Sequence, residues 1–251
     1  MKAITLSDFG GPEMMRFTEV ETPAPGDNQV LIRVKATSVN RPDIIQRQGN
    51  YPAPPGDSEI LGLEVAGIVE TTGENVTRYA PGDSVVSLVG GGGYAEYALA
   101  LESHTMPIPE SISFEQAACI CETYITAYLN LFMIAELQGK QSVLIHGGGG
   151  GVATAAIQLC KALTPDTEIF VTASPNKIER VKQQGADHVI DYQTQDFGAE
   201  VKRISEKRGV DVILDHIGAK YLDANLKSLA VGGCIMPVSY THLTLPTILL
   251  V

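Results

Sequence analysis

Hydrophobic and polar residues alternate in short runs over the first hundred positions of the chain. Residues 30–35 and 84–89 show this alternation, and clusters of Pro and Gly separate such runs. A period of two is typical of strands with one buried face, and the Pro and Gly clusters indicate turns. Residues 42–48 differ, because Pro42 suits a first helical turn and Gly49 suits a helix end. The pattern predicts a β-rich region with one short helix.

The pattern changes after Pro109. Residues 111–137 are rich in Ala and other apolar residues, which favours helices, and strand and helix patterns then alternate. The segments concerned are 142–145, 152–162, 168–172, 178–184, 188–190, 201–207 and 210–214. Such alternation predicts a parallel sheet with crossover helices. The expected fold class is α/β, with a β-rich domain over residues 1–111 and a doubly wound domain over 112–238.

Composition narrows the possible partners. Hydrophobic residues make up 44% of the chain, enough for a sizeable core, and the net charge of −11 would repel nucleic acid and a negatively charged membrane surface. No uninterrupted apolar segment is long enough to cross a bilayer, and the first residues do not resemble a secretion signal. We expect a cytoplasmic protein without nucleic-acid or membrane partners. Its cysteines are expected to be reduced core thiols: Cys119, Cys121, Cys160 and Cys234.

Five consecutive glycines, residues 147–151, lie between a strand pattern and a helix pattern. This is the arrangement with which a Rossmann domain binds a pyrophosphate, because residues without Cβ let the backbone approach and the helix N-terminus offers free N–H groups. A flexible loop is the alternative, but the position between strand and helix favours nucleotide binding. The cofactor-site residues predicted here are Gly147, Gly150, Gly151 and Val152.

The end of the next strand bears on which dinucleotide binds. NAD-specific Rossmann domains usually carry Asp or Glu there, to accept hydrogen bonds from the ribose 2′-hydroxyl. Here the strand leads into Ser174, Asn176 and Lys177, with no acidic residue. A hydroxyl, an amide and a cation suit a 2′-phosphate, so NADPH is favoured, with Ser174 and Lys177 as contacts. For Lys177, a solvated charge at the start of the next helix is the alternative.

A set of ordered motifs resembles the zeta-crystallin-like quinone oxidoreductases, the zinc-free branch of the medium-chain dehydrogenases. The motifs are NRPDIIQRQGNY at 40–51, ILGLEVAG at 60–67, APGD at 80–83, MPIPE at 106–110 and GVATAAIQ at 151–158. The resemblance covers residues 1–238 and implies a GroES-like substrate domain packed against a Rossmann domain, with NADPH and substrate in the cleft. It implies cofactor contacts at Thr126 and Tyr192, for which packing is the alternative, and Gly218 is assigned to the same site.

The chain departs from the family pattern in two places. The family's Ala-x-x-Gly-x-x-Gly loop appears as Gly147-x-x-Gly150-x-x-Ala153, so we expect binding with slightly looser helix packing. Residues 239–251 show nothing of the family, and we expect a non-native tail, with a divergent natural terminus as the alternative. A foreign tail would leave the Rossmann sheet incomplete, so a homodimer is expected only if the C-terminal strands are present.

The resemblance places the zinc ligands of the related alcohol dehydrogenases at Asn40, Leu63 and Glu122. Leucine has no lone pair, so no metal site is expected. Without a Lewis acid the acceptor must itself delocalise the charge of the incoming hydride, as a quinone or an activated enone does. The catalytic candidates are Asn40 and Tyr51. The amide of Asn40 could bond the substrate or the ribose of the cofactor's nicotinamide, so Asn40 is also a cofactor-site candidate, and it could in addition or instead cap the helix after it. Tyr51 could instead be a surface aromatic. His146 is interpreted as a packed side chain and not as a general base.

The leading hypothesis is an enzyme that transfers hydride from NADPH to a quinone or a related activated carbonyl compound. Reduction of enones or 2-enoyl thioesters is the enzymatic alternative. The third possibility is a non-catalytic NADPH-binding protein, either crystallin-like or truncated.

Overall fold

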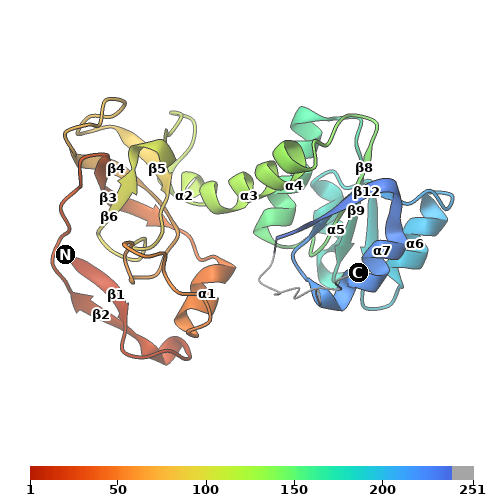
Figure 1. The fold of residues 1–251 in the computed structure, drawn as a ribbon, viewed down its shortest axis with the longest axis horizontal. Coiled ribbons are helices and arrows are strands. Elements are labelled where there is room, and N and C mark those ends of the chain that lie inside the picture. Colours follow the sequence, from red (N-terminus) through yellow and green to blue (C-terminus); the bar gives the residue numbers. More distant parts are fainter. Residues whose placement is uncertain (239–251) are drawn as a thin grey trace, which may run out of the picture. The chain divides into compact units, whose positions relative to one another are not determined.

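The computed structural model describes residues 1–238, so the expected tail, 239–251, lies outside the described residues. The chain divides into two compact units, Met1–Glu122 and a second that begins at Thr123 (Figure 1). The first unit therefore extends past the expected boundary at 111. The reason is that α2 (Phe114–Ala117) packs on strands β3 and β4 of the first unit, where Ala117 and Cys121 join Ala66 in one buried cluster.

The first unit is built on an antiparallel five-stranded sheet. The strand order is β6 (Tyr97–Leu101), β3 (Gln29–Thr37), β4 (Glu64–Thr72), β5 (Ser84–Leu88) and β7 (Thr105–Pro107). Alternate side chains such as Val30, Ile32 and Val65 form the core, as the period of two predicted. A separate hairpin pairs β1 (Lys2–Leu6) with β2 (Met15–Glu19), and the helices are η1 (Pro12–Met14), α1 (Arg41–Arg47) and η2 (Glu102–His104).

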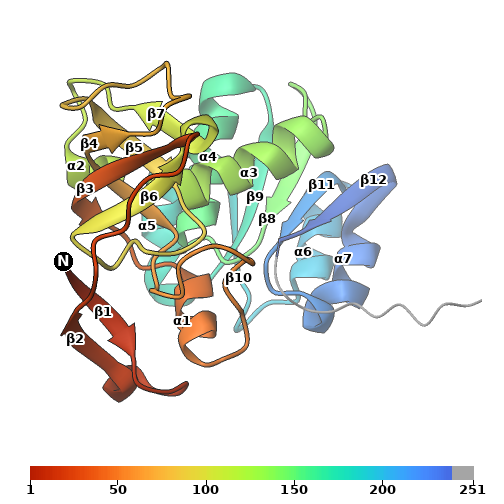
Figure 2. The same ribbon diagram turned by 60° about the vertical axis from the view of Figure 1, so that its left-hand side comes forward.

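The second unit is a parallel sheet with the order β10 (His188–Asp191), β9 (Glu168–Ala173), β8 (Ser142–Ile145), β11 (Val210–Asp215) and β12 (Leu229–Pro237). Helix α4 (Gly151–Leu163) and α5 (Ile178–Gln183) contribute to one buried cluster. On the other face, α6 (Phe197–Ile204) and α7 (Leu222–Ser228) lie side by side (Figure 2). Short turns η5 (Pro175–Lys177) and η6 (Ala219–Tyr221) complete the unit. The doubly wound α/β prediction is confirmed.

The strand order places the site. Because β8 pairs with both β9 and β11, the chain order reverses at β8, and ligands of such sheets bind beyond the carboxyl ends of the strands at this point. The glycine run follows β8 directly, so it lies at the switch point.

The helical stretch Phe114–Ile134 continues from α2 through η3 (Cys121–Ile125), α3 (Thr126–Tyr128) and η4 (Leu129–Ile134). It has 21 residues, and an 18-residue window of it has a mean hydropathy of 1.4, so by length and composition alone it could cross a membrane, which the sequence did not predict. One such helix is weak evidence, since core helices of soluble proteins meet the same criterion.

The cysteines are all free thiols but do not share one environment. Cys121 and Cys160 are buried, and burial raises the pKa of each to about 12, as expected for inert core thiols. Cys234 is half-buried. Cys119 is exposed, so the expectation that every cysteine is a core thiol was wrong for this one.

Candidate functional site

The glycine loop after β8 packs so closely that side chains would not fit at several positions. Gly147 has φ = 61°, a conformation that L residues rarely adopt, and a Cβ there would lie 2.4 Å from Nε2 of His216. A Cβ on Gly148 would lie 2.3 Å from Cγ1 of Val171. These glycines let the loop turn tightly against the ends of β9 and β11.

Gly150 differs from its neighbours. It is the N-cap of α4, with an extended backbone (φ −92°, ψ 166°). Apart from its chain neighbours, the only described atom within 4 Å of a Cβ there would be the carbonyl oxygen of Gly147, at 3.4 Å. No side chain of residues 1–238 caps the 13-residue helix that begins at Gly151. The N–H groups of the first helical turn have no intrahelical partner, and together with the helix dipole they favour an anion. The open side of Gly150 fits a pyrophosphate.

Lys177 lies directly over this loop. A Cβ on Gly149 would come within 2.0 Å of Cδ and 2.9 Å of Nζ of Lys177. Among residues 1–238, Lys177 forms no ion pair, whereas Lys182 on the following helix pairs with Glu179 at 2.9 Å. The structure therefore brings Lys177 to the glycine loop. The Ser174 hydroxyl, in the same turn, donates to Oδ1 of Asn176 at 2.7 Å.

The other predicted cofactor residues are placed differently. Tyr192 follows β10 and is 41% exposed, so it is not a core side chain. Gly218 follows β11 with φ = 86° and donates its N–H to Oδ1 of Asp215 at 3.0 Å. Val152, in the first turn of α4, packs half-buried against the core. Thr126 lies half-buried on α3, where its carbonyl accepts from Nδ2 of Asn130 at 2.8 Å.

A network of buried polar side chains, which the sequence did not predict, holds the loops at the ends of β8, β9 and β11 in place. His146 is fully buried; its Nδ1 lies 3.0 Å from Oγ1 of Thr172, and its Nε2 lies 2.7 Å from Oδ1 of Asn225. Because the amide oxygen can only accept, Nε2 carries the proton and Nδ1 accepts from the Thr172 hydroxyl. Burial lowers the pKa of His146 to about 4, so the ring is neutral. The interpretation of His146 as a packed side chain is confirmed.

The network continues to the loop after β11. Nδ2 of Asn225 donates to Oδ2 of Asp215 at 2.9 Å, and Oδ1 of Asp215 accepts from the N–H groups of Ile217 and Gly218 at 2.7 and 3.0 Å. At the other end, Gly147 N donates to Oγ1 of Thr172 at 3.3 Å. The loops after β8, β9 and β11 are thus joined by one chain of hydrogen bonds.

The first unit carries a second polar cluster, centred on the buried Glu64. Nδ2 of Asn40 donates to Oε1 of Glu64 and to Oγ of Ser38, both at 2.8 Å, and the Ser38 hydroxyl donates to the same carboxylate oxygen. The Asn40 N–H donates to Oδ2 of Asp43 at 2.7 Å. Asn40 therefore caps α1, as its alternative interpretation predicted, while its amide anchors Glu64.

Further carboxylates surround Glu64. Glu122 donates its N–H to Oε2 of Glu64 at 3.0 Å, and burial, followed by the charges of Glu64 and Asp43, raises the pKa of Glu122 to about 7. The hydroxyl of Tyr94 donates to Oδ2 of Asp43 at 3.0 Å, and burial raises the pKa of Asp43. The cluster can hold or release protons near neutral pH, whereas carboxyls in water titrate lower.

The positions that correspond to zinc ligands do not fit zinc. Leu63 is buried and has no lone pair, and the amide of Asn40 already donates to Glu64 and Ser38. Within residues 1–238, no three His, Cys, Asp or Glu side chains are arranged to hold a metal ion. The chemistry of the donor set argues against a zinc centre here.

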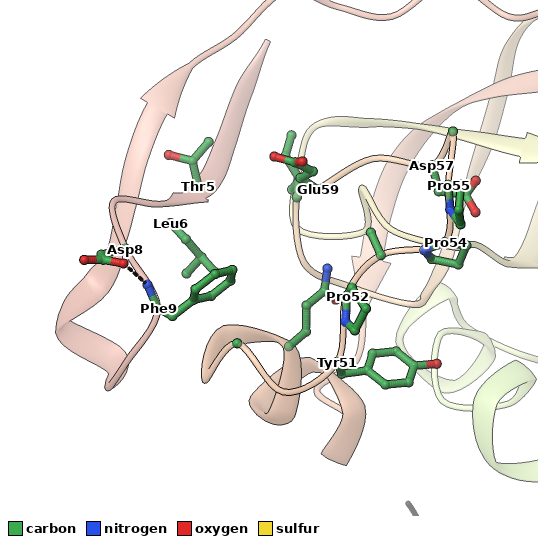
Figure 3. Close-up of a pocket in the computed structure, with 15 residues that line it drawn as sticks. Thr5, Leu6, Asp8, Phe9, Tyr51, Pro52, Pro54, Pro55, Asp57 and Glu59 are labelled. Atoms are coloured by element: carbon green, nitrogen blue, oxygen red, sulfur yellow. Dashed lines mark hydrogen bonds between the residues drawn. The ribbon is translucent and has the colours of Figure 1, made fainter.

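Tyr51 lies half-buried on the loop after α1, beside Pro52. It contributes to the wall of a pocket in the first unit, and its phenol oxygen points away from Leu6 and Phe9, which form the opposite wall (Figure 3). The structure therefore places Tyr51 at a loop surface.

Known protein families match both units. The family described as "Alcohol dehydrogenase GroES-like domain" matches residues 26–110, and the one described as "Zinc-binding dehydrogenase" matches residues 151–249.

Individual relatives agree with these matches. The quinone oxidoreductase of Rattus norvegicus is 36% identical over 241 residues, covering 95% of this chain and 73% of the relative. The synaptic vesicle membrane protein VAT-1 homolog of Danio rerio is 40% identical over 218 residues, 86% of this chain and 45% of the relative. The chain spans about half the length of the VAT-1 relatives that it matches.

Solved structures show the same likeness. The CurK enoyl reductase has a TM-score of 0.86 at 30% identity, over 93% of this chain and 72% of that one. A mycobacterial protein solved in complex with NADPH has a TM-score of 0.85 at 34% identity, over 94% of this chain and 73% of that one.

Proposed function

Because the chain belongs to the zeta-crystallin-like quinone oxidoreductases of the medium-chain dehydrogenase superfamily, we propose that it reduces quinones or related activated carbonyl compounds with NADPH. The observation that carries the proposal is the glycine loop at the switch point, open at Gly150 and covered by Lys177. The same chain has Leu63 at a position where the related alcohol dehydrogenases carry a zinc ligand, and leucine cannot bind zinc.

The residues of the second unit fit NADPH. When bound, NADPH supplies the hydride that reduces the acceptor. The first-turn N–H groups of α4 would bind the pyrophosphate, and Lys177, Ser174 and Asn176 would bind the 2′-phosphate. Strand β9 ends at Ala173 without a carboxylate that would repel that phosphate, which supports NADPH over NADH. A similar mycobacterial protein was solved with NADPH.

Leu63 and Asn40 do not fit zinc, the Lewis acid of the related alcohol dehydrogenases, and this bears on the kind of acceptor. An alcohol needs a Lewis acid to form its alkoxide near neutral pH, whereas a quinone delocalises the hydride's charge over its own ring. Asn40 and Tyr51 are the proposed substrate contacts. To donate to a bound carbonyl, the Asn40 amide would exchange its hydrogen bond to Ser38 or Glu64. The first unit would then mainly orient the acceptor.

The likeness to the CurK enoyl reductase supports a second candidate, the reduction of 2-enoyl thioesters by the same hydride transfer. Steady-state rates of NADPH oxidation with 1,4-naphthoquinone and with a crotonyl thioester separate the two. We expect the higher kcat/KM for the quinone, unchanged by a metal chelator. A preference for the thioester would replace the quinone assignment. Quenching of NADPH fluorescence without oxidation by either acceptor would identify a non-catalytic binding protein.

A cytoplasmic location stays a prediction, as does a homodimer if the C-terminal strands are present. Cell fractionation tests the first, and the mass of the purified protein in solution tests the second.

A further inference from the structure

A pocket with a volume of about 580 Å³ lies wholly within the first unit, between the β1–β2 hairpin and the loop after α1 (Figure 3). This volume is in the range of small-molecule sites. None of the residues of the Glu64 cluster lines it, and the glycine loop belongs to the other unit. The pocket therefore shares Tyr51 with the proposed acceptor contacts, but none of the Glu64 cluster or the glycine loop.

The walls of the pocket are apolar and stiff. Leu6 and Phe9 form one side, and the chain of Pro52, Pro54 and Pro55 forms the other (Figure 3). Proline fixes its backbone, so little freedom is lost when a ligand binds such a wall. The Phe9 side chain is 64% exposed, so most of this large apolar ring faces solvent. An apolar ligand body would cover this ring.

The hairpin wall is fixed in place by its contacts with α1. Gly10 N donates to the carbonyl of Arg47 at 2.9 Å, and Nε of Arg47 donates to the carbonyl of Gly10 at 3.1 Å. The Phe9 ring packs so closely over Gly49 that a Cβ there would lie 2.9 Å from Cγ of Phe9. The pocket is thus a preformed feature of the unit.

The charged groups that line the pocket are all carboxylates, which accept hydrogen bonds and donate none when ionised. Asp8, Asp57 and Glu59 line it, with no Lys or Arg among the lining residues. The Glu59 carboxylate extends toward the hairpin (Figure 3) and makes no hydrogen bond or ion pair within the described residues. Asp57 differs, because its Oδ2 lies against Gly90, 2.1 Å from where a Cβ would be. Oδ1 of Asp8 already accepts from the Phe9 N–H at 2.7 Å.

Gln46 provides independent evidence that the pocket has room for a hydrogen-bond donor. It lines the pocket, is only 5% exposed, and its Oε1 has no hydrogen-bond partner in the described part of the chain. A buried acceptor left without a donor lowers stability, because its hydrogen bond to water is lost and not replaced. The terminal amide of Gln turns over a broad torsional range, so this oxygen can rotate toward a donor in the pocket.

We propose that this pocket binds a primary ammonium compound with an apolar body, with the body against Phe9 and the prolines and the ammonium group between Glu59 and Gln46. An ammonium group offers three donors and no acceptor, which matches a carboxylate and an amide oxygen.

Isothermal titration of the full chain with 4-phenylbutylamine and with 4-phenylbutanol tests the proposal. The two probes share one apolar body and differ in the charged donor. We expect saturable binding of the amine, at least about tenfold tighter than that of the alcohol, as charge-assisted hydrogen bonds give. Equal affinity for the two probes, or no saturable binding of the amine, would overturn the proposal.

Two variants locate the site. Glu59→Gln should weaken amine binding about tenfold or more, whereas Asp57→Asn, with the same change of net charge, should stay within about twofold. Equal losses would mean that only net charge matters and would overturn the proposal, as would competition by NADPH. Both residues are exposed, and a thermal melt of each variant checks its fold. NADPH binding, measured separately, tests the proposed function independently.

Discussion

Nε2 of His146 lies 2.7 Å from Oδ1 of Asn225, although the two residues are 79 positions apart in the chain. This hydrogen bond joins the end of β8 to helix α7, and Asn225 passes the connection to Asp215 at the end of β11. The loops that would contact the dinucleotide are therefore held by buried side chains that do not touch it. Such supporting shells fix the geometry of a site.

Replacing Asn225 should show this coupling. Asn225→Leu leaves Nε2 of the buried His146 and Oδ2 of Asp215 without a hydrogen-bond partner, which should lower the free energy of unfolding by about 3 kcal/mol. Loosening of the loop after β11 should weaken NADPH binding as well. Urea unfolding and NADPH titration measure the two effects. The control Leu226→Ala, at an exposed neighbour, should change stability by less than about 0.5 kcal/mol.

The pH dependence of stability should reflect His146. Its pKa falls from 6.5 in the unfolded chain to about 4 in the folded protein, so between these values the unfolded chain binds more protons. Stability from this group is therefore complete above pH 6.5 and is lost as the pH falls toward 4, by about 3 kcal/mol. Unfolding free energies across this window check the trend. His188→Gln, at a partly exposed ring, is the control and should retain it.

The contribution of Glu122 to stability should depend on pH with the opposite sign. Its pKa rises from 4.5 to about 7 on folding, so the folded protein binds more protons between these values and loses stability as the pH rises through them. The loss is on the order of 2 kcal/mol after allowance for solvent screening. Glu122→Gln should remove this decline and be the more stable protein at pH 8. The exposed Glu179→Gln should not, and an equal gain there would contradict the assignment.

Lys177 should set the cofactor preference. Lys177→Gln removes the cation over the glycine loop and should weaken NADPH binding by about 10- to 100-fold, because a charge-assisted hydrogen bond to phosphate is lost. NADH binding should change little. Fluorescence titrations with both nucleotides measure this. Lys182→Gln, whose ammonium pairs with Glu179, is the matched control and should bind NADPH normally.

Much of the fold followed from local patterns. The segments 142–145 and 210–214 became β8 and β11 with one residue of difference at most, because buried parallel strands are short apolar runs between turns. The division after Glu122 lies beyond the expected boundary at 111, since nothing local in 111–122 shows that α2 packs on β3 and β4. Which strands pair is equally a long-range property.

The residues of the candidate site, too, could be predicted from the sequence only in part. Gly147, Gly150 and Lys177 could be predicted because they lie next to strand ends in the sequence. Asn225 could not, because its partners His146 and Asp215 come from other segments of the chain. Glu64 did leave a signal, as the single acid in the apolar motif at 60–67, and its burial makes it the centre of a cluster.

The central claim is that the loop after β8 binds the pyrophosphate of NADPH, and Gly150→Val tests it most directly. The extended backbone of Gly150 suits valine. In the part of the chain that the structure describes, a Cβ there would come within 4 Å of the Gly147 carbonyl oxygen and of no other atom beyond its chain neighbours, so the variant should fold. Its side chain would occupy the phosphate position. Titration of NADPH fluorescence should show binding by the original chain and none by the variant, with matching thermal melts. No binding by the original chain, or equal binding by a folded variant, would contradict the account.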